Sequence, residues 1–149
     1  MVPLFEQLLE QYPEDVKLIF KNYPLSRHAY AKKAAIAAVA AQKQEKFWEY
    51  HDRLFENYDR LNDQKFREIA RELNLDMEKF EKDLNDPATI LRVDKDYQLG
   101  HSVGVGGTPT IFINGSISKA RTLEELRATV EDNLQKARRR AGLNEGQMR

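Results

Sequence analysis

The chain has 149 residues, of which 41% are apolar and 32% charged, and its 24 Lys and Arg residues balance 24 Asp and Glu residues. This composition is typical of a globular domain with a hydrophobic core, and the balanced charge indicates no overall preference for nucleic acid or an acidic lipid surface. No cysteine is present, so these residues can form neither a disulfide nor a thiolate nucleophile or ligand. We find no secretory signal and no apolar run of membrane length.

The first 42 residues are predicted to form a helix, a strand and a second helix. Apolar residues recur at helical spacing from 3 to 12, and the β-branched and aromatic run at 16–20 is typical of a strand. A turn at 22–24 follows. Alanine dominates 26–42, which predicts a closely packed helix that has Ser26 as its N-cap.

Four further helices are predicted in the middle of the chain. Their starts and ends are marked by polar capping residues, by proline at a first helical position and by glycine at an exit. They are expected at 45–58, after a cap at Asn62 or Asp63, from Asp76, and from Pro87 to Gly100.

The C-terminal part is predicted to form a hairpin and one closing helix. Asn-Gly at 114–115 is a strong two-residue turn signal, and it joins predicted strands at 110–113 and 116–118. Thr122 is expected to cap the last helix, with Glu125 three residues on completing a capping box.

The segment that leads into this hairpin is the strongest candidate for a binding site. Proline cannot donate to a sheet ladder, so a proline directly before a buried strand must lie at the strand's entrance. The backbone there would present an exposed edge that could hold a ligand. The residues concerned are Val105, Gly106, Gly107, Thr108 and Pro109.

Other kinds of site find little support. A dinucleotide fingerprint starting at Gly104 would need glycine where Pro109 stands, and no phosphate-loop lysine follows. The histidines are scattered without metal-ligand spacing, so we predict neither a metal nor a cofactor. His51 is expected in the core, and His101 is the histidine nearest the candidate segment. We find no catalytic triad.

Two more groups of side chains are assigned structural roles. Phe47, Trp48 and Phe55 recur at helical spacing and are predicted to be core residues. The basic run at 138–140 is interpreted as a solvated helix end that complements the helix dipole.

Three strings together resemble the DsbA-like thioredoxin-fold thiol:disulfide oxidoreductases. They are Phe-Lys-Asn-Tyr-Pro-Leu at 20–25, Phe-Trp-Glu-Tyr-His-Asp-Arg-Leu-Phe at 47–55 and Gly-Thr-Pro-Thr-Ile-Phe-Ile-Asn-Gly at 107–115. The resemblance covers nearly the whole chain. It implies an α/β thioredoxin-like fold at 1–25 and 101–142 with an inserted helical subdomain at 26–100. The tail at 143–149 is predicted to be disordered because of its terminal position.

The resemblance also implies how the candidate segment would work. Thr108-Pro109 matches the family's cis-proline loop, although an X-Pro bond judged without the resemblance would be expected to be trans. In that family the loop edge pairs with an extended substrate peptide through main-chain hydrogen bonds. Residues Val105 to Pro109 are therefore expected to bind extended peptide or protein substrates.

The chain departs from the family where the family's redox chemistry begins. The first strand and the Cys-x-x-Cys motif that should precede the helix at 3–12 are missing, so no residue here can carry dithiol-disulfide exchange. We therefore expect a truncated or redox-inactive member of the family. The alternative is a thioredoxin-fold module that binds peptides or partner proteins without catalysis. A glutathione-transferase-like relative is a third, weaker interpretation.

Two more expectations depend on the resemblance. Without the first strand, the strands at 16–20 and 110–113 would both have unpaired edges. Copies of the chain are therefore expected to associate by strand sharing or helix exchange, or the two strands to pair directly. The full-length parent is expected to be periplasmic or extracytoplasmic.

Overall fold

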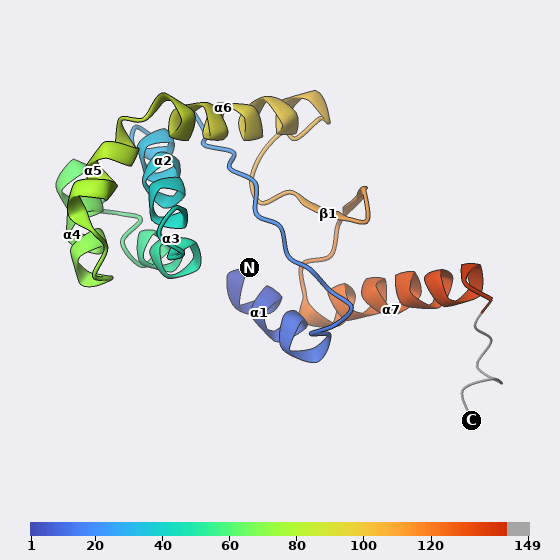
Figure 1. Cartoon of the computed structure of the whole chain (residues 1–149). Coiled ribbons are helices and arrows are strands. Elements are labelled where there is room, and N and C mark those ends of the chain that lie inside the picture. Colours follow the sequence, from blue (N-terminus) through green and yellow to red (C-terminus); the bar gives the residue numbers. More distant parts are fainter. Residues whose placement is uncertain (143–149) are drawn as a thin grey trace. The chain divides into compact units, whose positions relative to one another are not determined.

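The computed structural model describes residues 1–142, and the predicted disordered tail at 143–149 lies outside the described residues. The described part is mostly helical and has one small sheet of two strands (Figure 1). Its elements are α1 (Val2–Gln11), α2 (Ala31–Gln42), α3 (Phe47–Glu56), α4 (Asp63–Glu72), α5 (Met77–Leu84), α6 (Pro87–Ser102), β1 (Ile111–Ile113), β2 (Ser116–Ser118) and α7 (Leu123–Arg140). None of these helices is long and apolar enough to cross a bilayer.

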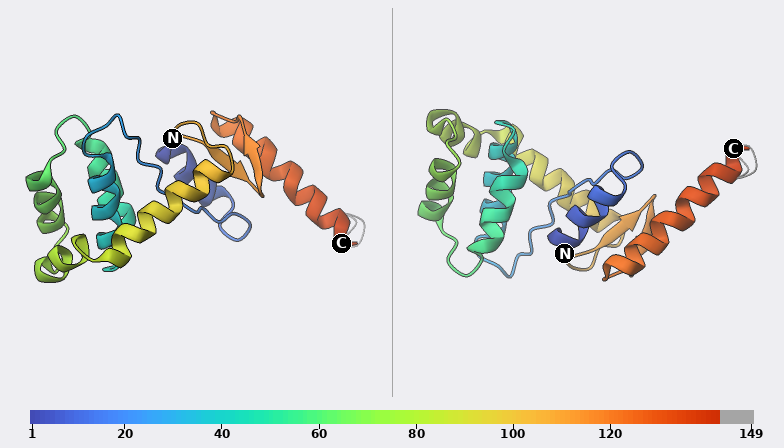
Figure 2. Two further views of the ribbon diagram at one scale, coloured as in Figure 1. Left: turned by 90° about the horizontal axis from the view of Figure 1, so that it is seen from above. Right: turned by 90° about the horizontal axis from the view of Figure 1, so that it is seen from below.

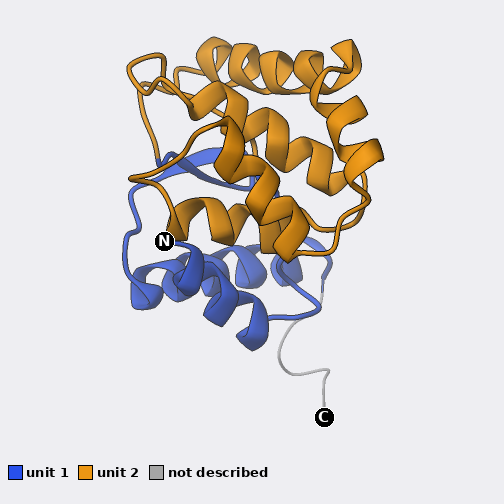
Figure 3. Cartoon of the chain, turned by 90° about the vertical axis from the view of Figure 1, so that its left-hand side faces the viewer, with its two compact units in different colours: residues 1–20, 109–149 blue, residues 21–108 orange. Residues whose placement is uncertain are grey.

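The chain forms two compact units (Figure 3). Unit 1 combines residues 1–20 with the chain from 109 onward, and unit 2 contains residues 21–108. The boundary at 108/109 falls between Thr108 and Pro109, inside the candidate segment. Each unit has its own hydrophobic core.

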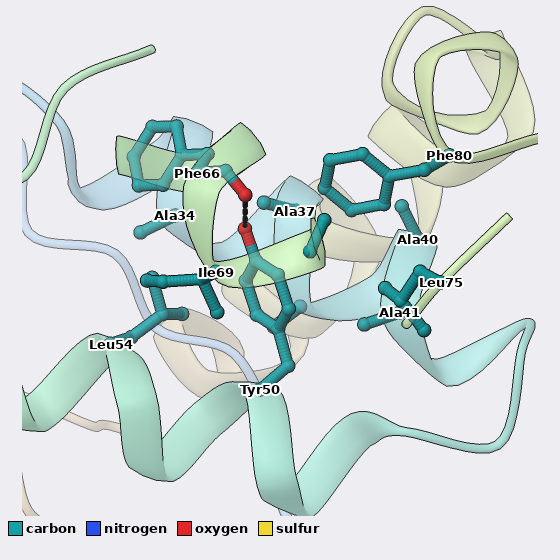
Figure 4. Packing of buried hydrophobic residues seen from close by; sticks show 12 residues of the cluster. Ala34, Ala37, Ala40, Ala41, Tyr50, Leu54, Phe66, Ile69, Leu75 and Phe80 are labelled. Atoms are coloured by element: carbon teal, nitrogen blue, oxygen red, sulfur yellow. Dashed lines mark hydrogen bonds between the residues drawn. The ribbon is translucent and has the colours of Figure 1, made fainter. Parts of the chain in front are cut away.

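Unit 2 is organised around the alanine-rich helix α2, which packs against α3, α4, α5 and α6. Alanine suits this position because its short side chain lets neighbouring helices approach closely while it keeps the highest helix propensity. Ala37, Ala40 and Ala41 are completely buried, and they face large side chains from the surrounding helices (Figure 4).

Tyr50 lies at the centre of this core and is completely buried. Its ring centroid is 5.8 Å from that of Phe80, and its hydroxyl donates a 2.8 Å hydrogen bond to the Phe66 carbonyl (Figure 4). Burial raises the pKa of Tyr50 well above its usual value, so the hydroxyl stays protonated as a donor. This bond joins α3 to α4 inside the core.

Most helix starts agree with the capping residues predicted from the sequence. The side chains of Asn62 and Asp76 accept the backbone N–H of the residue three positions on, at 2.8 and 3.0 Å, and Pro87 opens α6. At α7 the capping box between Thr122 and Glu125 is complete. These predictions are confirmed because capping depends on neighbours along the chain.

Unit 1 contains α1, α7 and the hairpin. α1 packs on α7 around a small core of Leu8, Ala120, Leu126 and Val130. The hairpin lies beside α7 (Figure 2), where the side chain of Asn114 hydrogen-bonds to that of Asn133 at 3.2 Å. Asn114 and Gly115 both have positive φ, 47° and 82°, as the predicted two-residue turn requires.

The hairpin register leaves one edge of β1 uncovered. Ile113 pairs with Ser116 next to the turn and Phe112 pairs with Ile117, in a sheet whose described strands are β1 and β2 alone. Because the pair that closes a two-residue turn exchanges hydrogen bonds, the next pair does not, and its N–H and C=O groups point away from the partner strand. The backbone groups of Phe112 therefore point to the open edge of β1.

The strand predicted at 16–20 does not form. This segment is irregular, and Ile19 is 65% exposed. Direct pairing with the hairpin is also absent from the described sheet, which contains β1 and β2 only. The physical reason is that β-branched residues favour a strand only when a neighbouring strand supplies ladder hydrogen bonds.

Two predicted helix boundaries are wrong. Ser26 is not an N-cap, because residues 25–31 form consecutive turns and α2 begins at Ala31. Gly100 is not the exit of α6, which continues to Ser102. A Cβ at Gly100 would lie 2.8 Å from a ring carbon of Tyr23, so glycine is needed here for close packing.

The predicted burial of the α3 aromatic residues is also only partly right. His51 is buried as expected, but Trp48 and Phe55 are 40% and 61% exposed. The helix instead turns Tyr50 and Leu54 into the core of unit 2. An aromatic residue with a polar tip was missed as a core residue because its hydroxyl finds a partner only in the folded state.

Candidate functional site

The candidate segment is held firmly at its first residue, Val105. The Val105 N–H donates to the Gly100 carbonyl at the end of α6, at 2.9 Å. The Val105 carbonyl accepts a 2.8 Å hydrogen bond from the Tyr23 hydroxyl. Both backbone polar groups of Val105 are therefore bound within unit 2.

The next residues alternate in exposure. Val105 and Gly107 are half-buried, whereas Gly106 and Thr108 are exposed. Within residues 1–142, the backbone groups of Gly106 and Thr108 make no hydrogen bond. Gly106 and Thr108, two positions apart, therefore both have main-chain donors and acceptors that are not used. A peptide that binds in an extended conformation would form its hydrogen bonds to such groups.

Space around this stretch is open. Cβ atoms built at Gly106 or Gly107 would have no heavy atom within 4 Å. The chain bends at 107–109. Glycine at both positions keeps side-chain bulk away from the exposed backbone, so a ligand main chain can approach closely.

Tyr23 is held on two sides before it reaches Val105. Its ring stacks on Tyr97 of α6, with centroids 4.6 Å apart and an interplanar angle of 17°. On the same helix, Gly100 leaves the space that the ring edge fills. Partial burial raises the pKa of Tyr23 above its usual value, and the neighbouring Tyr97 adds to this, so the hydroxyl remains a donor at neutral pH.

The residue before Tyr23 is fixed to the same helix. Both the backbone N–H and the side-chain amide of Asn22 donate to Oδ2 of Asp96, at 3.1 and 2.9 Å. Lys21 Nζ lies 3.3 Å from the other carboxylate oxygen. Asp96 is only 4% exposed, and these donors satisfy a charge that burial would otherwise penalise.

The sequence identified the segment but missed its supports. The local pattern predicts a turn at Asn22 and Tyr23 and a helix that contains Asp96, Tyr97 and Gly100. A signal was present on α6, where a charged residue, an aromatic residue and a glycine share one face at helical spacing. A buried carboxylate on such a face needs a partner from elsewhere in the chain.

The segment carries no charged side chain, so recognition there would depend on the main chain and on shape. Among residues 1–142, no group of three or more His, Asp or Glu side chains could hold a metal ion. His101, which the sequence placed near the segment, lies exposed in the last turn of α6.

The family model of the DSBA-like thioredoxin domain matches residues 4–131 of this chain. The chain belongs to this family. The DsbA-like match therefore covers most of α1, all of unit 2, the hairpin and the first half of α7. The chain contains no cysteine, so the Cys-x-x-Cys motif is absent from it.

Solved structures share the DsbA-like thioredoxin fold with this chain. The thiol-disulfide exchange protein alpha-DsbA2 of Wolbachia pipientis matches with a TM-score of 0.76 and 25% identity, over 88% of this chain and 72% of that one. ScsC of Proteus mirabilis, in a compact conformation, matches with a TM-score of 0.77 and 25% identity, over 92% of this chain and 76% of that one.

Curated relatives are of two kinds. A Na(+)/H(+) antiporter, NhaA 3 of Salinispora tropica, is 37% identical over 114 residues, which are 76% of this chain but 17% of the antiporter. A probable disulfide bond formation protein D of Bacillus anthracis is 25% identical over 91% of this chain and 66% of its own length. The chain therefore spans less than a fifth of the antiporter it matches.

Proposed function

We propose that this chain supplies the substrate-binding part of a DsbA-like thiol:disulfide oxidoreductase, and that it binds extended polypeptide along residues 105–109. The observation that carries the proposal is the pair of exposed, unbonded backbones at Gly106 and Thr108, next to a firmly held Val105. Family membership supports it, because the solved relative from Wolbachia is named as a thiol-disulfide exchange protein.

The proposal separates binding from chemistry. Disulfide exchange needs a thiolate, and these 149 residues contain none. Any redox step at this site would take its cysteines from outside these 149 residues. Within these residues, 26–100 would act as an inserted helical subdomain that presents the candidate segment.

A second function is favoured by one observation. The antiporter match shows that a stretch like this chain occurs within a much longer protein of another activity. The chain would then be a peptide- or partner-binding module without catalysis. Both functions require the same binding edge, and they differ in whether a dithiol is brought to the bound peptide.

The binding edge is tested by titrating the ¹⁵N-labelled chain with an unfolded, cysteine-free polypeptide. We expect the amide signals of Gly106 and Thr108 to shift, while those of Gly115 in the hairpin turn stay in place. Pro109→Ala should weaken binding. Equal binding by the wild-type chain and Pro109→Ala, or amide shifts confined to other residues, would overturn the proposal.

A second arm examines the chemistry. A peptide with one cysteine and its serine counterpart should bind with equal affinity, and neither should form a covalent complex that survives non-reducing electrophoresis. Preference for the cysteine peptide would show that binding depends on the thiol side chain, contrary to main-chain recognition.

A further inference from the structure

The start of the candidate segment is bound by two hydrogen bonds of different origin. One is local, from Val105 N–H to the Gly100 carbonyl five residues earlier. The other comes from Tyr23, 82 positions away in the sequence, whose hydroxyl holds the Val105 carbonyl at 2.8 Å. The local bond continues the end of α6, so Tyr23 is the long-range restraint on this peptide group.

The two glycines make such a restraint necessary. Gly106 and Gly107 follow directly, and glycine loses more backbone freedom on becoming ordered than any other residue. A ligand that pairs with a freely moving glycine segment must itself supply the ordering free energy. A segment that is already oriented in the free protein binds its ligand more tightly, because no further ordering free energy is lost on binding.

The surroundings of Tyr23 show that its position is itself determined. Tyr97 stacks on one side of the ring, and the missing side chain of Gly100 makes room for its edge. Asn22, the residue before it, is bound through two hydrogen bonds to the buried Asp96. The hydroxyl is therefore placed by three residues of one helix, α6, and not by the segment that it contacts.

We propose that Tyr23 is a positioning residue for polypeptide binding: its hydroxyl orients the Val105 peptide group so that Gly106 and Thr108 present their backbones to an extended ligand. This proposal depends on the proposed function for its ligand. The restraint on the segment can be measured without any ligand.

The first test is Tyr23→Phe, which removes the hydroxyl and keeps the ring that stacks on Tyr97. We expect amide hydrogen exchange at Gly106 and Thr108 to become faster in the free protein. Binding of the cysteine-free unfolded polypeptide should weaken about fivefold, the size of effect that one neutral hydrogen bond gives.

The matched control is Tyr12→Phe in unit 1. The Tyr12 hydroxyl donates to a carboxylate oxygen of Glu131 at 2.6 Å, on the surface of that unit. This variant also loses one tyrosine hydrogen bond, but in unit 1, whereas Val105 to Thr108 belong to unit 2. It should leave both the exchange rates at Gly106 and Thr108 and the affinity for polypeptide unchanged.

A second variant, Gly100→Ala, disturbs the same restraint from the helix side. The new Cβ would lie 2.8 Å from the Tyr23 ring and must displace it, while alanine strengthens α6 as a helix. Faster exchange at Gly106 and weaker binding, with no loss of helix content by circular dichroism, would separate a positioning role from general damage to the fold.

The possible outcomes distinguish the two proposals. If the wild-type chain binds polypeptide and Tyr23→Phe changes neither exchange nor affinity, the positioning role is wrong. If the wild-type chain binds no polypeptide but Tyr23→Phe still accelerates exchange at Gly106 and Thr108, the restraint is real and the proposed function is wrong.

Discussion

Asn22 and Asp96 form a two-point contact, in which the backbone N–H and the side-chain amide of Asn22 reach the same carboxylate oxygen. This contact fixes the first residues of unit 2 to α6. It also sets the position of Tyr23, the next residue in the chain. The stability of unit 2 and the geometry of the candidate segment should therefore depend on one buried carboxylate.

Replacing Asp96 with alanine should destabilise unit 2. The change leaves the Asn22 donors unpaired in a buried site, which costs about 2–4 kcal/mol of unfolding free energy. Urea unfolding measures the loss. The control is Asp94→Ala on the same helix, where a partly exposed carboxylate pairs with Lys32 at 2.8 Å and should contribute less than about 1 kcal/mol. Equal losses in the two variants would contradict the role given to Asp96.

The open edge of β1 should bring two copies of the chain together. Phe112 directs its N–H and C=O outward, and a short apolar strand without charged residues has no protection against pairing with its own copy. We expect light scattering to show a dimer whose population grows with concentration.

Two proline variants identify the edge that is used. Phe112→Pro removes the outward N–H of β1, and Ile117→Pro removes the corresponding N–H on the outer edge of β2, while the bonds of the hairpin are kept. Only the Phe112 variant should become monomeric. A wild-type chain that stays monomeric at all concentrations would exclude association through this edge.

Unit 2 should lose stability in acid through Asp83. Burial alone would raise the pKa of Asp83, but hydrogen bonds to Lys79 and Lys43, at 2.7 and 3.1 Å, outweigh it and hold the pKa below its usual value. A lowered folded-state pKa means stability that is present above the unfolded-state value near 4 and is lost as the pH falls below it.

The measurement compares urea unfolding at pH 7 and pH 3 for the wild-type chain and Asp83→Asn. The variant should be less stable than the wild type at pH 7, and the difference should shrink at pH 3, where the Asp83 carboxyl of the unfolded wild-type chain becomes protonated. A difference that is independent of pH would show that the lysine pairing contributes nothing.

The capping box of α7 gives a prediction for unit 1. Thr122 accepts the Glu125 N–H at 3.2 Å, and the Glu125 side chain accepts the Thr122 N–H at 3.1 Å. Thr122→Ala should lower the unfolding free energy by about 1 kcal/mol. Thr129→Ala, in the interior of the same helix, should have no such cost, because alanine favours that position. A larger loss from Thr129→Ala would be inconsistent with the cap.

The parts of the fold that depend on neighbouring residues could be predicted from the sequence. Helix caps at Asn62, Asp76 and Thr122 and the turn at Asn114 involve contacts within four positions, so local chemistry determines them. The position of Pro109 just before β1 could also be predicted, because a proline ahead of a β-branched run is confined to the entrance of a strand.

Features that depend on distant partners could not be predicted. The run at 16–20 has the composition of a strand, but no composition shows whether a second strand will lie beside it. Tyr23 is typical of a turn, and its role emerges only when residue 105 is folded back onto α6. A glycine at position 100 is typical of a helix exit. In the structure it is needed because the Tyr23 ring fills the space that a side chain would occupy.

A 2.8 Å hydrogen bond from the Tyr23 hydroxyl to the Val105 carbonyl connects residues near the two ends of unit 2. Because residues near both ends share this contact, residues 21–108 are suitable for circular permutation: a glycine linker can join Thr108 to Lys21, and new termini can be opened in the exposed turn at 58–60. The permuted helical unit should fold by itself, and it could then be inserted as an independent domain into other proteins.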